Sequence, residues 1–60
     1  MPNRNHVKSD LLEHYEFSMM YEKEILLLDS KSSPHIHMLI ISMESENQRV
    51  MRGLIKQLNL

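Results

Sequence analysis

The sequence has no cysteine and no tryptophan, and it has one glycine and two prolines in 60 residues. Without cysteine there can be no disulfide bond, thiolate zinc site or cysteine nucleophile. A single glycine, Gly53, excludes a glycine-rich phosphate-binding loop. The longest apolar runs, Ile25 to Leu28 and Met38 to Ile41, are far shorter than the roughly 20 residues of a membrane span. We therefore expect a cytoplasmic protein that does not enter membranes.

The residues that are present fit one small folded domain. Charged residues make up 25% and hydrophobic residues 42% of the chain, values that are typical of neither a disordered tail nor a membrane protein. The net charge is −1, but acidic residues concentrate between Lys8 and Asp29. A domain of this size buries only about 60% of the surface of its unfolded chain.

The segment Ser30–Pro34 predicts a turn between two helices. Proline is disfavoured inside a helix but common at its first position, and a serine directly before it can cap the helix. Ser33 and Pro34 thus predict a second helix over about 34–58. The first helix is expected to start near Asn5 or, with better capping, at Ser9 or Asp10, and to span about 9–29 after a frayed tail 1–6. The expected fold is all-α, an antiparallel helical hairpin with its turn at 30–33.

Spacings of three and four residues select the positions at which the two helices would meet. If the turn is centred near residue 32, facing residues have numbers that sum to about 64, which places Ser18 opposite Asn47. The expected interhelical positions are Val7, Leu11, His14, Ser18, Tyr21, Ile25 and Leu28 on the first helix and Ile36, Ile40, Met43, Asn47, Val50, Leu54 and Gln57 or Leu58 on the second.

A second apolar stripe flanks these positions, and a two-helix layer leaves such a stripe exposed. Self-association into a four-helix bundle is the simplest way to bury it, so we expect a homodimer. The residues assigned to the core and the dimer are Leu11, Leu12, Tyr15, Ser18, Met19, Tyr21, Ile25, Leu26, Ile36, Ile40, Met43, Asn47, Val50, Met51, Leu54 and Ile55.

Further apolar residues fall outside both stripes, beside an acidic surface. Methionine repacks easily against different partners, which suits a contact patch for another protein. The alternative is that these residues are scattered surface positions or belong to a different dimer. The predicted partner-binding residues are Phe17, Met20, Leu27, Met38, Glu13, Glu16 and Glu24. The predicted function is a small regulator or inhibitor of a basic, nucleic-acid-handling protein.

Two other functions stay open from the sequence. The chain could bind RNA or DNA through Arg49, Arg52 and Lys56, or it could be a simple oligomerisation module. No enzyme activity, cofactor or metal is expected. His14 and Ser18 share a helix face without an orienting carboxylate. His35 and His37 diverge at i,i+2 spacing, although Asp29 could approach them across the turn.

Overall fold

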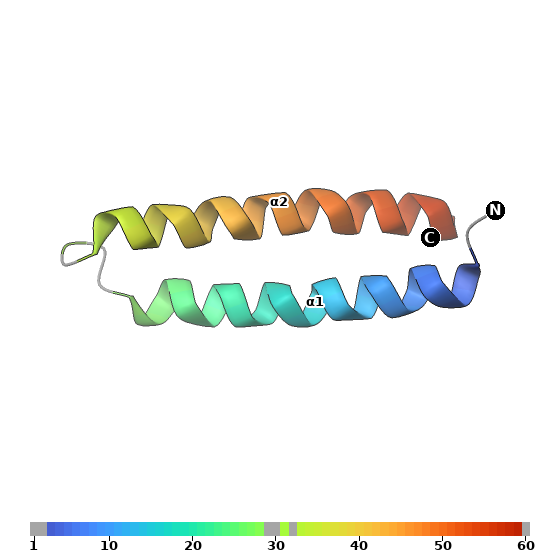
Figure 1. The fold of residues 1–60 in the computed structure, drawn as a ribbon, viewed down its shortest axis with the longest axis horizontal. Helices are drawn as coiled ribbons and strands as arrows, with labels where there is room; N and C mark the ends of the chain where they lie inside the picture. The colour runs from blue at the N-terminus through green and yellow to red at the C-terminus, as the bar shows by residue number, and fades with distance from the viewer. Residues whose placement is uncertain (1–2, 29–30, 32, 60) are drawn as a thin grey trace.

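The protein is a hairpin of two antiparallel helices, which confirms the predicted all-α hairpin. The computed structural model describes residues 3–28, 31 and 33–59. Helix α1 spans Arg4–Leu27 and helix α2 spans Pro34–Leu58. They lie side by side, with the start of α1 and the end of α2 at the same end of the molecule (Figure 1). The Cα atoms extend over 46 × 15 × 14 Å, so the molecule is a short rod.

Of the two starts that the sequence leaves open for the first helix, the structure has the earlier one, because helix α1 begins at Arg4. Asn3 is its N-cap, and the Asn3 side chain accepts a hydrogen bond of 2.8 Å from the Asn5 amide. Neither Ser9 nor Asp10 caps the helix, and residues 4–6 of the expected frayed tail are helical. The first turn is held against α2, because Val7 is buried and the Arg4 guanidinium donates to the Leu58 carbonyl at 3.3 Å. Tertiary contact thus extends the helix beyond the predicted capping box.

Local signals mark the other helix ends. Helix α1 ends at Leu27, before the predicted residue 29, and the Leu28 amide donates to the Glu24 carbonyl. Pro34 occupies the first turn of α2, but the Ser33 side chain makes no capping bond within the described residues. At the far end Asn59 adopts the left-handed conformation, which asparagine tolerates better than most residues, and its amide donates to the Ile55 and Lys56 carbonyls. Asp29, the predicted last residue of the first helix, and Ser30 and Ser32 of the predicted turn lie outside the described residues.

The interhelical positions of α1 match the predicted spacing, whereas those of α2 differ at every second position. The prediction that Ile36, Met43 and Val50 lie between the helices was wrong for the isolated hairpin: their exposed fractions are 52%, 42% and 37%. Each is replaced by the next residue in the chain. The buried or half-buried positions of α2 that follow spacings of three and four are His37, Ile40, Glu44, Asn47, Met51, Leu54 and Leu58, and Gln48 and Ile55 beside them are also half-buried.

The end of α1 explains this difference. Hydrogen bonds between α1 and α2 join Arg4 to Leu58, His14 to Asn47 and Ser18 to Glu44. The residue numbers in these pairs sum to 61 or 62, below the predicted value. Because α1 stops at Leu27 and α2 starts at Pro34, the centre of the hairpin lies nearer the N-terminus than the serines suggest. The smaller sum brings Glu44 opposite Ser18.

The hairpin leaves most of its apolar surface uncovered. Among the described residues, the buried hydrophobic side chains are Val7, Met51 and Leu58 alone, while thirteen large hydrophobic side chains are exposed. A monomeric protein rarely exposes so much contiguous apolar surface without a use for it. No helix in the described part of the chain is both long and apolar enough to cross a membrane.

Candidate functional site

A polar layer crosses the middle of the interhelical interface, and Asn47 is its most buried residue together with Ser18. The Asn47 side-chain amide donates to the His14 carbonyl at 2.7 Å, which leaves Asn47 Oδ1 facing His14 Nδ1, also at 2.7 Å. Since Oδ1 can only accept, His14 Nδ1 carries a proton and donates it. Asn47 is therefore fixed by His14, and the predicted pairing of Asn47 with Ser18 was wrong.

Ser18 belongs to a second polar group with Glu44 and Gln48. The Ser18 hydroxyl donates to Glu44 Oε1 at 2.9 Å, and the Gln48 side-chain amide donates to both Ser18 Oγ and Glu44 Oε1, at 2.8 and 2.7 Å. Glu44 Oε2 is buried and has no hydrogen-bond partner in the described part of the chain. The sequence interpretation missed this carboxylate because Met43 suits an interhelical position better than glutamate does.

The two groups hold the helices in register. His14 bonds Asn47 rather than Ser18, and the Ser18 hydroxyl donates toward Glu44, so the histidine and the serine do not form a nucleophile–base pair. Buried polar residues that satisfy one another across a helix pair act by penalising other registers. This arrangement indicates a structural role for the layer.

One flank of the hairpin, which we call the Phe17 face, carries an open apolar groove of about 310 Å³ between the helices. Phe17 packs edge-on against the His14 ring, with ring centroids 5.7 Å apart, and its centroid lies 6.5 Å from that of the Tyr21 ring. These contacts hold the exposed phenyl ring in place. The groove is lined by His14, Phe17, Tyr21, Met43, Glu46, Asn47 and Val50.

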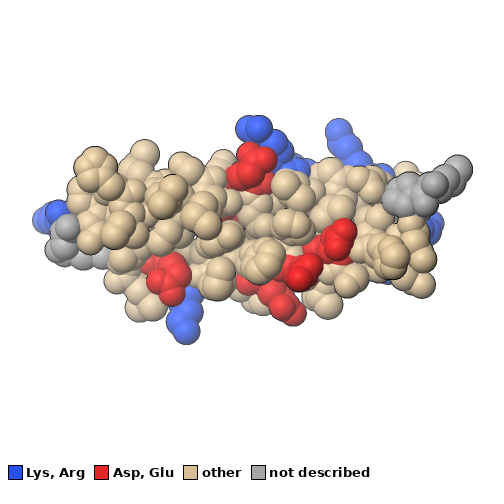
Figure 2. Space-filling model, viewed as in Figure 1, with Lys and Arg blue, Asp and Glu red and all other residues tan. Residues whose placement is uncertain are grey.

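The Phe17 face continues along both helices. Each residue that directly precedes an interhelical position turns toward this flank, as the shared lining of Phe17, Met43 and Val50 indicates. Its charged members are all acidic. By this spacing the Phe17 face comprises His6, Asp10, Glu13, Phe17, Met20, Glu24 and Leu27 of α1 and Ile36, Leu39, Met43, Glu46, Val50, Gly53 and Gln57 of α2. One broad surface of the molecule has acidic side chains gathered over α1 and mainly uncharged side chains over α2 (Figure 2).

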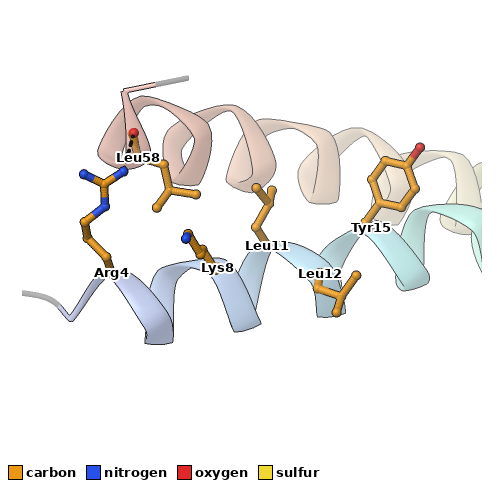
Figure 3. Close-up of a pocket in the computed structure, with 6 residues that line it drawn as sticks. All are labelled: Arg4, Lys8, Leu11, Leu12, Tyr15 and Leu58. Carbon is orange, nitrogen blue, oxygen red and sulfur yellow. Dashed lines mark hydrogen bonds between the residues drawn. The ribbon is translucent and has the colours of Figure 1, made fainter.

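The opposite flank, which we call the Tyr15 face, consists of the residues that directly follow interhelical positions. It carries an open pocket of about 320 Å³ near the ends of the chain (Figure 3). Leu11 points from α1 toward α2, and Arg4 reaches the Leu58 carbonyl across the mouth of the pocket (Figure 3). The pocket is lined by Arg4, Lys8, Leu11, Leu12, Tyr15 and Leu58. On α1 the face comprises Lys8, Leu12, Tyr15, Met19, Glu22 and Leu26.

The predicted partner-binding residues do not all share one surface. Phe17, Met20 and Leu27 recur on the Phe17 face, together with Glu13 and Glu24. Met38 directly follows the half-buried His37 and so turns toward the Tyr15 face. Glu16 lies between His14 and Ser18 and points away from α2. The structure therefore separates Met38 and Glu16 from the other members.

The residues of the alternative basic site lie on the exposed surface of α2. Arg49 and Lys56 point away from α1, whereas Arg52 directly follows Met51 and so turns toward the Tyr15 face. Arg49, Arg52 and Lys56 are exposed and recur at spacings of three and four. Arg49 Nη1 lies 3.7 Å from Glu46 Oε2, a solvent-exposed pair in which the glutamate offsets one of the three positive charges. His35 and His37 do not join a metal-binding cluster within the described residues, and Asp29 lies outside them.

Comparison with protein-family models, with curated proteins and with solved structures finds no match for this chain. The chemistry of its two exposed faces is therefore what indicates its function.

Proposed function

We propose that this protein is a non-enzymatic regulator that binds another protein through the Phe17 face, and that it does so as a homodimer. The observation that carries this proposal is the apolar groove of about 310 Å³ whose charged residue is Glu46. An exposed apolar groove with a polar border is typical of a protein-binding surface.

The shape of the groove favours a helical ligand. It runs between two antiparallel helices, and Met43 and Val50 are seven residues apart along one of its walls. An amphipathic helix that lies in such a groove presents anchors at i, i+3 or i+4 and i+7. Phe17 supplies an aromatic anchor of the kind that dominates binding energy. Met43 supplies a side chain that adapts to different ligands.

The charges on the Phe17 face favour a basic ligand. Asp10, Glu13, Glu24 and Glu46 border the apolar residues, and no lysine or arginine occupies this face in the described part of the chain. Complementary charge raises the association rate and disfavours acidic partners. Basic amphipathic helices are common on proteins that handle nucleic acid, and a regulator that covers such a helix would act as an inhibitor.

Homodimerisation explains the remaining apolar surface. Once a ligand covers the Phe17 face, Leu12, Tyr15 and Met19 of the other flank are still exposed. A second hairpin packed on that flank completes a four-helix bundle.

A library of displayed helical peptides with random polar positions tests the proposed ligand. Peptides captured by the protein should be enriched in lysine and arginine on their polar side. Their binding should weaken about tenfold or more when Phe17→Ser and Met43→Ser remove the groove walls, because truncated anchors cost about 2 kcal/mol or more at an interface.

The matched control for this test is Met38→Ser with Ile41→Ser, which replaces two exposed apolar residues of α2 that directly follow interhelical positions and so lie off the Phe17 face. This variant should retain most of the peptide binding. Enrichment of acidic peptides, or binding that survives Phe17→Ser with Met43→Ser, would contradict the proposal.

A further inference from the structure

The α1 part of the Tyr15 face is a regular stripe with nothing packed on it in the hairpin. Leu12, Tyr15 and Met19 follow one another at spacings of three and four residues, and Glu22 and Leu26 continue the pattern. The exposed fractions of Leu12, Tyr15, Met19 and Leu26 are 61%, 56%, 54% and 85%. This spacing is the one by which helices pack along their length.

The stripe has a projection and a recess that match each other. Leu26, the most exposed large hydrophobic residue in the described part of the chain, lies near the turn end, whereas the pocket that Lys8 helps to line lies near the chain ends. Suppose that two α1 helices pack antiparallel about an axis midway between Tyr15 and Met19. Leu26 of each copy then lies level with Lys8 of the other and enters its pocket. Tyr15 meets Met19 of the second copy, an aromatic–sulfur contact that occurs twice.

The charges of the α1 stripe are arranged so that positive residues of one copy face a negative residue of the other when two such stripes pack antiparallel. Arg4 and Lys8 occupy the beginning of α1, and Glu22 occupies its second half. In the antiparallel arrangement, Glu22 of one copy is level with Leu12 of the other, one helical turn or about 6 Å along the axis from Lys8. The long lysine side chain spans this offset, so two Lys8–Glu22 pairs form in each dimer.

We infer that a second copy of this chain binds the Tyr15 face, with the two α1 helices antiparallel and Lys8 paired with Glu22 of the other copy. This inference rests on the homodimer of the proposed function and assigns its interface. The Phe17 face is unsuited to the same role, because all its charged residues are acidic and two copies would bring like charges together.

Charge reversal tests the inference. Lys8→Glu alone puts two glutamates against each other at both pairs of the dimer, and Glu22→Lys alone puts two lysines against each other there. Each variant by itself should dissociate about tenfold more readily than the wild-type dimer at low salt, in line with the modest strength of exposed ion pairs. An equimolar mixture of the two variants should form a heterodimer that dissociates less readily than either variant homodimer. Because lysine and glutamate have almost the same mass, one variant is labelled uniformly with ¹⁵N, and native mass spectrometry then separates the heterodimer from the two homodimers by mass.

The heterodimer is favoured because each of its two ion pairs joins opposite charges. In one pair, the glutamate introduced at position 8 of the first variant faces the lysine introduced at position 22 of the second variant. The other pair joins the native Lys8 to the native Glu22 and is the wild-type pair. Both pairs of the heterodimer are therefore attractive, and its affinity should be near that of the wild-type dimer.

Neither substitution should unfold α1. Both positions are exposed, and an acid near the start of a helix or a base near its end interacts favourably with the helix dipole. Helicity measured by circular dichroism should therefore be unchanged. Lys23→Glu and Glu16→Lys are matched controls, because they reverse the same charges on the side of α1 that faces away from α2, and they should leave the dimer intact.

Two results would overturn the inference in different ways. Wild-type dimerisation of both single variants, or a mixture that forms no excess of heterodimer, would exclude this interface while leaving a homodimer in place. A wild-type protein that stays monomeric at all concentrations would also exclude the homodimer of the proposed function.

Discussion

Asn47 shows how one side chain fixes the relative position of two helices. The Asn47 side-chain nitrogen donates a hydrogen bond to the His14 carbonyl, and Asn47 Oδ1 accepts one from His14 Nδ1. Sliding α2 by one residue would break both hydrogen bonds and leave polar atoms buried without partners, at about 1–3 kcal/mol for each such atom. The Asn47 amide nitrogen also donates to the Met51 sulfur, at 3.7 Å.

A double-mutant cycle on His14→Ala and Asn47→Ala should reveal this interaction. We expect Asn47→Ala to lower the free energy of unfolding by about 2 kcal/mol, since two hydrogen bonds of about 1 kcal/mol each are lost. The coupling between the two substitutions should be about 1 kcal/mol, because only the Oδ1–Nδ1 bond requires both side chains. Urea unfolding at a fixed protein concentration measures all four states.

The control for this cycle pairs Asn47→Ala with Lys23→Ala, an exposed substitution on the outer side of α1. Those two effects should add. Additive effects of His14→Ala and Asn47→Ala would show that the ring nitrogen contributes nothing to stability.

At the scale of single residues the sequence identified the polar positions but not their partners. His14, Ser18 and Asn47 were all expected between the helices, whereas Glu44 was not. The predicted sum of facing residue numbers was too large by about two or three, which is enough to place Asn47 opposite Ser18 where the structure has Glu44. Such an error leaves the hydrophobic pattern of α1 unchanged. Partner identity depends on where α1 ends, which the run of serines does not specify to within about two residues.

At the scale of the helices, α1 and α2 differ in how much of their interface can be predicted. On α1 the predicted interhelical positions are the buried or half-buried ones, and the second apolar stripe of this helix, Leu12, Tyr15, Met19 and Leu26, is exposed as expected. On α2 two parallel choices exist, because Ile36, Met43 and Val50 form as regular a stripe as the interhelical positions that directly follow them. The side that faces solvent in the hairpin is as apolar as the side that faces α1, so composition could not separate them.

Gly53 has the lowest helix propensity in the interior of α2. Replacing it therefore tests directly whether another molecule packs against this helix. A Cβ atom built at Gly53 meets nothing within 4 Å, and the residue is exposed. Gly53→Ala should therefore raise the free energy of unfolding by about 0.5–1 kcal/mol, since glycine has the greater conformational entropy in the unfolded chain. Gln57→Ala is the control, because glutamine already has a helix propensity near that of alanine.

Urea unfolding of both variants provides the measurement. A loss of stability in Gly53→Ala would mean that another molecule packs closely against α2 at this position. Since Gly53 directly precedes the interhelical Leu54, that molecule would lie on the Phe17 face.

At the scale of the whole molecule, the hairpin is too thin to enclose a core. Its two layers of side chains bury few hydrophobic residues completely, and each flank exposes a stripe. The sequence predicted that a second stripe needs a partner, and the structure adds that there are two such surfaces with different charges. Mixed charge on the Tyr15 face suits a second copy, and acidic charge on the Phe17 face suits a basic helix.

Stability should accordingly depend on protein concentration. If the folded state is a dimer, a tenfold increase in concentration adds about 1.4 kcal/mol to the free energy of unfolding per dimer. The melting temperature followed by circular dichroism should therefore rise over a concentration series. A melting temperature that is constant across this series would show that the hairpin folds as a monomer.

The distribution of methionine makes the two flanks sensitive to oxidants. Met19, Met20, Met38 and Met43 are exposed, whereas Met51 is buried between the helices. Oxidation to the sulfoxide turns an apolar thioether into a polar group and proceeds first where the sulfur is accessible. In a dimer joined through the two α1 helices, Met19 would be shielded, and Met20, Met38 and Met43 would be oxidised first. Oxidative damage would thus remove the affinity for a ligand before it separated the subunits or unfolded the helices.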